Sequence, residues 1–313
     1  MDLVLPRPAE PREAPPPASR YFTPIDRITL GYVLVATAVL AAHYIGWHHT
    51  LAGRWEVVSL GTAHLLLLAL TLLAPRARLA AARRDGCFLT EWYPLIVMAG
   101  LYATIGLLND STEVGFDALA QRWELAVFGR QVAHDWIRTM PSPALSWVLH
   151  LCYLSFYPLI FVAPAGLWLT GRRAQARAAI YAIALAFFVC YIVFLLFPVE
   201  GPPYYWAWPD NAATAVWPAR VVHALIGGGD ARGSAFPSSH VAVSLVAAVA
   251  AWRGWRPLGA VLLVPAVGIV FAVVYSQIHY GVDALAGVAL AVVLCGIGRR
   301  LTPRLTAAAE GKR

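Results

Sequence analysis

Long apolar stretches separated by short basic connections constrain the fold of this chain more than any other feature. Of its 313 residues, 59% are hydrophobic and 13% are charged, whereas soluble domains average about 25% charged residues. A helix needs about 20 apolar residues to cross the hydrocarbon of a bilayer. Eight stretches approach this length: 28–47, 56–74, 92–108, 143–169, 176–198, 239–253, 257–275 and 279–299. We therefore expect an all-α integral membrane protein with about eight transmembrane helices.

Arginine and lysine are distributed unevenly over the connections between these stretches. Alternate connections, including both ends of the chain, hold 18 of the 24 basic residues, and the other connections hold 6. Cytoplasmic loops of membrane proteins are enriched in these residues. We therefore expect cytoplasmic termini, with the long loops 109–142 and 199–238 on the extracytoplasmic side. Because the arginines lie in loops rather than on one face, the net charge of +7 does not indicate nucleic-acid binding.

The loop 109–142 is expected to contain an interfacial helix. Phe116, Leu119, Trp123 and Val127 recur at helical spacing, and the charged residues fall on other faces. Such a helix would cap the bundle or guide a substrate. The acidic residues of this region would bind a polyol or amine headgroup, or would simply solvate the loop: Asp110, Glu113 and Glu124.

Two of the apolar stretches begin with a polar segment that contains a histidine. In SAFPSSHVAVSLV, Ser238 or Ser239 is placed to cap the helix that begins near His240, and its free amides would face an anion. Such a segment is also common as a simple helix cap. In YSQIHYGVDALAG, His279 and Asp283 are four residues apart on one helical face. A carboxylate that fixes an imidazole tautomer prepares a base or nucleophile, although the same pair also occurs as a structural hydrogen bond.

The order of the helices brings these two segments together. If 239–253 runs inward and 257–275 returns, His240 and His279 lie at the same level on the extracytoplasmic face. Ionisable residues inside a membrane are costly and usually functional. We therefore expect His240, His279 and Asp283 to form one phosphoryl-transfer site with a nucleophile, a group that orients it and an acid for the leaving oxygen.

The order proline, serine, any residue, histidine, followed by HxxxD at the start of the last stretch, resembles the type 2 phosphatidic acid phosphatase superfamily. The resemblance covers roughly residues 92–300. It implies that His279 attacks phosphorus and forms a phosphohistidine, that Asp283 orients it, and that His240 protonates the leaving group. It also implies that the serines of the first motif bind phosphate: Ser238 and Ser239. The HYGVD sequence is similar to the inositol phosphorylceramide and sphingomyelin synthase branch.

The basic residues that the superfamily uses for phosphate are missing here. The chain has no KxxxxxxRP motif, and Val273 occupies the position six residues before His279 where the superfamily has arginine. Arg232, eight residues before His240, is the first candidate to replace them, although it also fits a headgroup anchor. Other arginines with the same two interpretations are Arg122, Arg138 and Arg220. Weaker candidates for substrate binding are Tyr205, Gln277 and Tyr280.

Composition and the resemblance together divide the chain into four parts. Residues 1–24, rich in proline and charge, are expected to be a disordered cytoplasmic tail. Residues 25–90 would add two transmembrane helices to a six-helix catalytic core, 91–300. Residues 301–313 would form a basic cytoplasmic tail.

The expected function is phosphoryl chemistry on a lipid phosphate or a phospholipid headgroup. Water would complete a hydrolysis, and an alcohol such as inositol or a lipid hydroxyl would complete a transfer. The alternative is a lipid or ion translocator that uses His279 and Asp283 as a proton relay. A vanadium haloperoxidase is disfavoured, because those proteins are soluble and rich in anion-binding basic residues. No metal or other cofactor is expected, because the sequence shows no cluster of metal ligands.

Overall fold

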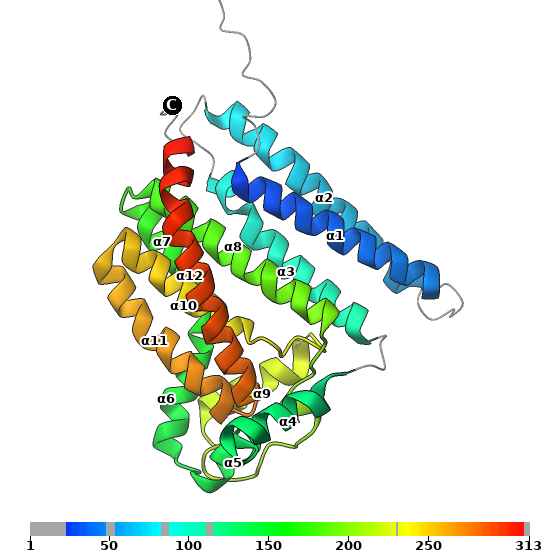
Figure 1. Ribbon diagram of the computed structural model, residues 1–313, viewed down its shortest axis with the longest axis vertical. Helices are drawn as coiled ribbons and strands as arrows, with labels where there is room; N and C mark the ends of the chain where they lie inside the picture. The colour runs from blue at the N-terminus through cyan, green and yellow to red at the C-terminus, as the bar shows by residue number, and fades with distance from the viewer. Residues whose placement is uncertain (1–22, 48–53, 83–87, 111–114, 230, 310–313) are drawn as a thin grey trace, which may run out of the picture.

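The described part of the chain is mainly helical, as Figure 1 shows for this computed structural model. It comprises residues 23–47, 54–82, 88–110, 115–229 and 231–309. The helices are α1 (Pro24–Trp47), α2 (Arg54–Ala82), α3 (Phe88–Asp110), α4 (Asp117–Phe128), α5 (Val132–Thr139), α6 (Pro143–Leu154), α7 (Phe156–Leu169), α8 (Arg173–Leu196), α9 (Trp217–Gly229), α10 (Ser239–Gly254), α11 (Arg256–Tyr275) and α12 (Gly281–Ala309). The all-α class expected from the sequence is confirmed.

Helix α10 forms the centre of the bundle and packs against α7, α8, α11 and α12. Its buried residues are mostly small: Ser239, Val241, Ala242, Val243, Ser244, Val246, Ala247, Ala248 and Ala251. Small residues let neighbouring helix backbones approach closely, which is how helices associate in membranes. Helices α4, α5 and α9 gather at one end of the bundle, and α1 and α2 lie along its side next to α3 (Figure 1).

Several helices are long and apolar enough to cross a membrane, so the protein is a multi-pass membrane protein. Among the described residues, α1, α8, α11 and α12 qualify alone, and α6 with α7 qualifies as a bent pair. Helices α2 and α3 contain shorter apolar segments, and α10 has only 16 residues. All eight predicted stretches are helical, but their number as spans stays a prediction.

The predicted stretch 143–169 forms two helices, α6 and α7, which are apolar enough together for one broken span. The chain bends by 50° between α6 and α7. Pro158 lies in the first turn of α7 and lacks an N–H, so the hydrogen bond to Leu154 that would continue α6 cannot form. The bend lies beside the site: Tyr153, near the end of α6, contacts His240 at 3.1 Å, and the ring of Phe156, at the start of α7, lies 4.4 Å from the ring of His240.

Helix α4 is oriented differently from the simple expectation that its charged residues face water. Asp117 and Glu124 are both fully buried, together with Ala120, whereas Leu125 and Val127 are more than half exposed. The interpretation of Glu124 as a solvating residue of a loop is therefore wrong. Glu124 is buried because α4 lies against the start of α12. The free N–H groups at a helix start require acceptors, and a carboxylate supplies them. Glu113 lies outside the described residues, as does the side chain of Asp110.

The two N-terminal helices are attached to the rest of the bundle by buried polar contacts. The hydroxyl of Tyr93 on α3 donates to Asp26 of α1 at 2.6 Å. His64 of α2 joins Thr37 of α1 at 3.2 Å and Thr104 of α3 at 3.1 Å. Residues 1–22, expected to be a tail, lie outside the described part of the chain. Most of the segment 301–313 continues α12 as a helix as far as Ala309.

Candidate active site

The two histidine motifs meet where α10 and α12 begin. Ser238 caps α10, its Oγ accepting from the amide of Val241 at 3.4 Å. Its own amide donates to the carbonyl oxygen of Asp283 at 3.0 Å, which joins the two helix starts. The approach is close: a Cβ at Gly287 would lie 2.7 Å from the carbonyl oxygen of Ser238. Of the two serines proposed as a cap, Ser238 is the one that caps.

His240, His279 and Asp283 lie in one row, in which His279 and Asp283 are buried and His240 is partly buried. The Nδ1 atom of His240 lies 3.2 Å from Nε2 of His279. Nδ1 of His279 lies 3.6 Å from Oδ2 of Asp283, which is within ion-pair range but longer than a hydrogen bond. Oδ2 also accepts from the amide of Tyr280 at 2.8 Å, so the carboxylate is held in place by the turn that carries His279. The structure thus brings together the three residues that the two motifs single out.

Tyr153 of α6 extends this row at the other end. Its hydroxyl oxygen lies 3.1 Å from Nε2 of His240, and the side chain is fully buried. These four residues, Tyr153, His240, His279 and Asp283, are the candidates for catalysis, and we refer to them as the catalytic row. Nothing in the sequence indicated Tyr153, because it lies inside an apolar stretch 87 residues before His240.

The turn between α11 and α12 is held in an unusual conformation. Gln277 has a φ of 56°, a left-handed conformation that non-glycine residues rarely adopt and that is often found near functional sites. Its amide accepts from Arg138 of α5 and donates to the carbonyl of Trp206 at 2.6 Å. Gln277, a weak candidate for substrate binding, is thus fully buried and engaged in shaping this turn.

The predicted phosphate-binding arginine is engaged elsewhere. The guanidinium of Arg232 forms an ion pair with Glu200 and lies 5.4 Å from the ring centre of Tyr204. Arg138, one of the alternatives, reaches the turn before His279 through its contact with Gln277. The remaining two, Arg122 and Arg220, have exposed side chains.

Tyr280 and Tyr205, the other weak candidates, differ in their surroundings. The fully buried hydroxyl of Tyr280 donates to Asp117 at 3.2 Å and accepts from the amide of Gln121 at 3.0 Å. Asp117 also accepts from the amide of Gly201 at 2.8 Å. Tyr280 therefore ties α4 to the turn that carries His279. Tyr205 is about half exposed, in the loop before α9.

Glu124 holds the start of α12 from the other side. Its two carboxylate oxygens accept from the amides of Ala133, at 3.2 Å, and Val282, at 3.0 Å. Burial raises the pKa of this carboxyl, and hydrogen bonds from the backbone at the starts of α5 and α12 partly oppose that rise. Sequence reasoning missed the role of Glu124, because no local pattern showed which helix start it would meet.

A cavity of about 250 Å³ opens beside His240. Ser239, His240 and Tyr153 contribute to its wall, and the other lining residues are aliphatic or aromatic. Three of its lining residues are exposed on the outer surface of the bundle: Tyr157, Phe161 and Leu225. The shape and lining suit an acyl or prenyl chain whose polar end reaches the catalytic row.

The fold and the paired histidines define a membrane-embedded protein of the phosphoesterase and phosphotransferase type. A family model described as the PAP2 superfamily matches residues 121–297, more than half of the chain, so the protein belongs to this superfamily. The resemblance drawn from the two motifs is thereby confirmed. No curated protein and no solved structure matches the chain. Among the described residues, no group of three or more histidine, cysteine, aspartate or glutamate side chains could hold a metal ion.

Proposed function

We propose that the protein is a lipid phosphatase or phosphotransferase that works through a phosphohistidine on His279. The observation that carries this proposal is the catalytic row beside a mainly apolar cavity. The PAP2 superfamily supports the reaction class, and the lining of the cavity supports a lipid substrate.

The geometry supports a division of roles along the row. The phosphoryl group enters between Nδ1 of His240 and Nε2 of His279, whose contact it replaces. Nε2 of His279 then attacks phosphorus, and Asp283 stabilises the positive charge that develops on the ring. With an anionic phosphate beside it, His240 carries both ring protons and gives the one on Nδ1 to the leaving oxygen.

Tyr153 determines which nitrogen of His240 exchanges the proton. After the proton leaves Nδ1, the remaining proton on Nε2 is donated to the hydroxyl oxygen of Tyr153. Nδ1 then serves as the base that takes a proton from water or an alcohol as its oxygen attacks the phosphohistidine. Amides in the first turn of α10, capped by Ser238, supply donors to the phosphoryl oxygens together with Ser239.

The site is proposed to face the extracytoplasmic side, because the connections that hold few arginines lie at the same end of the bundle as the site. A lipid would enter sideways past the exposed residues Tyr157 and Phe161, with its chain in the cavity. Both termini would then be cytoplasmic.

The proposal is tested with purified protein in detergent and a panel of labelled lipid phosphates, including phosphatidic acid and a prenyl diphosphate. We expect phosphate release or transfer, with an acid-labile label trapped on the protein. His279→Ala removes the nucleophile and should abolish both, because no other group in the row takes its position. The control is His134→Phe, a partly exposed histidine of α5, which should keep full activity. Lipid or ion transport that survives His279→Ala, without any phosphate release, would instead favour the translocator.

A further inference from the structure

A second group of buried polar side chains lies beside the catalytic row and has no part in the mechanism above. It consists of His150 on α6, His223 on α9 and Ser276 at the end of α11. Within the described residues, Nε2 of each histidine and Oγ of Ser276 are buried without a hydrogen-bond partner. The two imidazole centres are 5.9 Å apart. Buried polar atoms without partners are uncommon and costly, so three in one region indicate a place that receives another group.

The protonation of the two histidines defines what they can bind. Nδ1 of His150 lies 2.9 Å from the carbonyl oxygen of Ser146, which can only accept, so Nδ1 carries the proton and Nε2 presents a lone pair. Burial and the neighbouring His150 lower the pKa of His223 to about 4, so its ring is neutral at physiological pH. Neutral imidazoles offer no charge to a phosphate, whereas a lone pair on a buried ring nitrogen binds an O–H donor.

Aromatic rings surround this group. Trp208 stacks on His223 with ring centres 4.2 Å apart, and its Nε1 donates to the carbonyl oxygen of Ser276 at 3.2 Å. Tyr275 meets the ring of His150 edge to face at 6.2 Å. Aromatic faces that alternate with hydrogen-bonding atoms suit a polyhydroxy compound, whose C–H groups pack on the rings while its hydroxyls bind the polar atoms.

The position of the group relates it to the reaction. His150 lies about one helical turn before Tyr153 on α6, and Ser276 lies three residues before His279. His223 lies one turn before Ile226, which lines the cavity beside His240. Each of the three residues is therefore within about one helical turn, along the chain, of a residue of the catalytic row or of the cavity, where a second substrate would have to reach the phosphohistidine.

We propose that His150, His223 and Ser276 form a subsite for a polyhydroxy alcohol that accepts the phosphoryl group. This inference rests on the proposed function and names the acceptor class. One hydroxyl oxygen of the bound alcohol forms the new P–O bond as the P–N bond to His279 breaks, and its proton passes to Nδ1 of His240. A free polyol and the polyol headgroup of a lipid share this chemistry.

The test compares acceptors and variants. Labelled lipid phosphate is incubated with water alone, with glycerol or inositol, with a phospholipid that carries a polyol headgroup, or with diacylglycerol, and the products are separated by chromatography. His223→Phe keeps the stack on Trp208 but removes the nitrogen, and His223→Gln offers an oxygen acceptor in its place. We expect the acceptor KM to rise about 10-fold in His223→Phe and in His150→Phe, since one buried hydrogen bond is lost. His223→Gln should recover part of this loss, while His134→Phe and hydrolysis in water alone should be unaffected.

Several results would overturn the subsite. An unchanged acceptor KM in both variants would do so, as would transfer to diacylglycerol alone. Hydrolysis without transfer to any polyol would mean that these atoms bind only water, and it would leave the proposed function intact. A wild-type protein that releases no phosphate from any lipid would contradict the proposed function itself.

A binding measurement keeps the proposal testable if a variant does not fold. Saturation-transfer NMR of glycerol or inositol with the wild-type protein needs no turnover and no lipid. We expect the polyol signals to be attenuated, and no transfer of saturation at millimolar polyol would contradict the subsite.

Discussion

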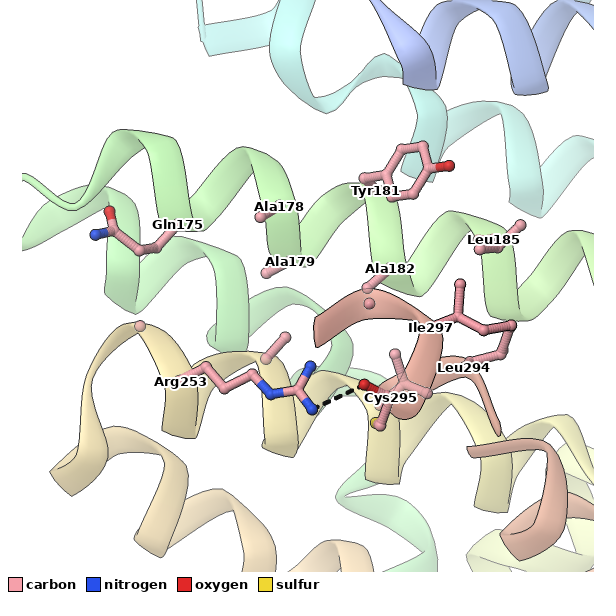
Figure 2. A pocket seen from close by; sticks show the side chains of 14 residues that line it. Gln175, Ala178, Ala179, Tyr181, Ala182, Leu185, Arg253, Leu294, Cys295 and Ile297 are labelled. Atoms are coloured by element: carbon pink, nitrogen blue, oxygen red, sulfur yellow. Dashed lines mark hydrogen bonds between the residues drawn. The ribbon is translucent and has the colours of Figure 1, made fainter. Parts of the chain in front are cut away.

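The two ends of the helical bundle are held together in different ways. At the end formed by α4, α5 and α9, buried carboxylates and amides hold the starts of α5 and α12 through hydrogen bonds between distant segments. At the other end, α8, α10 and α12 enclose a hollow of about 90 Å³ with mostly small and apolar walls (Figure 2). Arg253 lies there and donates to the carbonyl oxygen of Cys295 at 2.9 Å, as Figure 2 shows.

The difference reflects what each end must position. Close packing is enough where only helices need to meet, as at Gly254, where a Cβ would lie 2.6 Å from the side chain of Leu167. Catalysis requires side chains at fixed distances, and directional hydrogen bonds supply that accuracy. We call the end formed by α4, α5 and α9 the site end. Substitutions there should therefore reduce activity strongly, and substitutions at the opposite end, near Arg253, should reduce activity little.

The largest effect in this comparison is expected for Asp283→Asn. The amide keeps the size of the side chain but removes the charge that stabilises the developing imidazolium of His279. We expect kcat to fall on the order of 10³ to 10⁴-fold, as for other histidines that lose an orienting carboxylate. Steady-state kinetics on a lipid phosphate measure this. A fall of less than 10-fold would show that the 3.6 Å contact between these residues has no catalytic role.

A smaller effect is expected for Tyr153→Phe, which removes only the hydroxyl that contacts His240. Without it the ring proton is free to sit on either nitrogen, so kcat should fall about 10-fold, the value of one buried hydrogen bond. The fall should be greater for substrates with poor leaving groups, which need the acid most. His240→Ala provides the reference, since it should show the same dependence on leaving group more strongly. An equal loss on all substrates would indicate a purely structural role for Tyr153.

Glu124→Gln tests how much the hydrogen bonds of Glu124 at the site end contribute to the stability of the protein. The variant loses one of two acceptors for backbone amides, so it should be less stable by about 1–3 kcal/mol. Burial raises the pKa of Glu124, so folding favours the protonated form of this side chain. The stability that protonated Glu124 gives the wild-type protein is therefore lost as pH rises through the raised pKa. The gap in stability between wild type and variant should therefore be widest below pH 4.5 and narrow as pH rises. Thermal unfolding in detergent across this range measures the gap, and a gap that widens with pH would contradict the raised pKa.

The smallest effect is expected at the opposite end, for Arg253→Gln. The arginine is largely exposed and makes a backbone contact, so its loss should change stability by less than about 1 kcal/mol and leave kcat unchanged. The same activity and unfolding assays apply. A loss of activity comparable to that of Tyr153→Phe would show that the two ends are coupled, and the contrast between them would no longer hold.

The sequence by itself determined the features that depend on local spacing. Apolar stretches of membrane-spanning length predicted the helices, and the four-residue interval predicted that His279 and Asp283 share a face. The two motifs also pointed to the superfamily, because their residue types, spacing and order resemble its motifs. Each of these features depends on residues near one another in the chain.

Only the tertiary structure decided which distant groups meet. Tyr153 reaches His240 across 87 positions, and Glu124 reaches Val282 across 158. Arg232 pairs with Glu200, although the sequence made it the first candidate for binding phosphate, with a headgroup anchor as the alternative. Such contacts depend on how helices pack and bend, as α6 and α7 do, and not on the period of any one helix. For that reason the pairing of His279 with Asp283 could be predicted from the sequence, whereas the groups that hold the two residues in place could not.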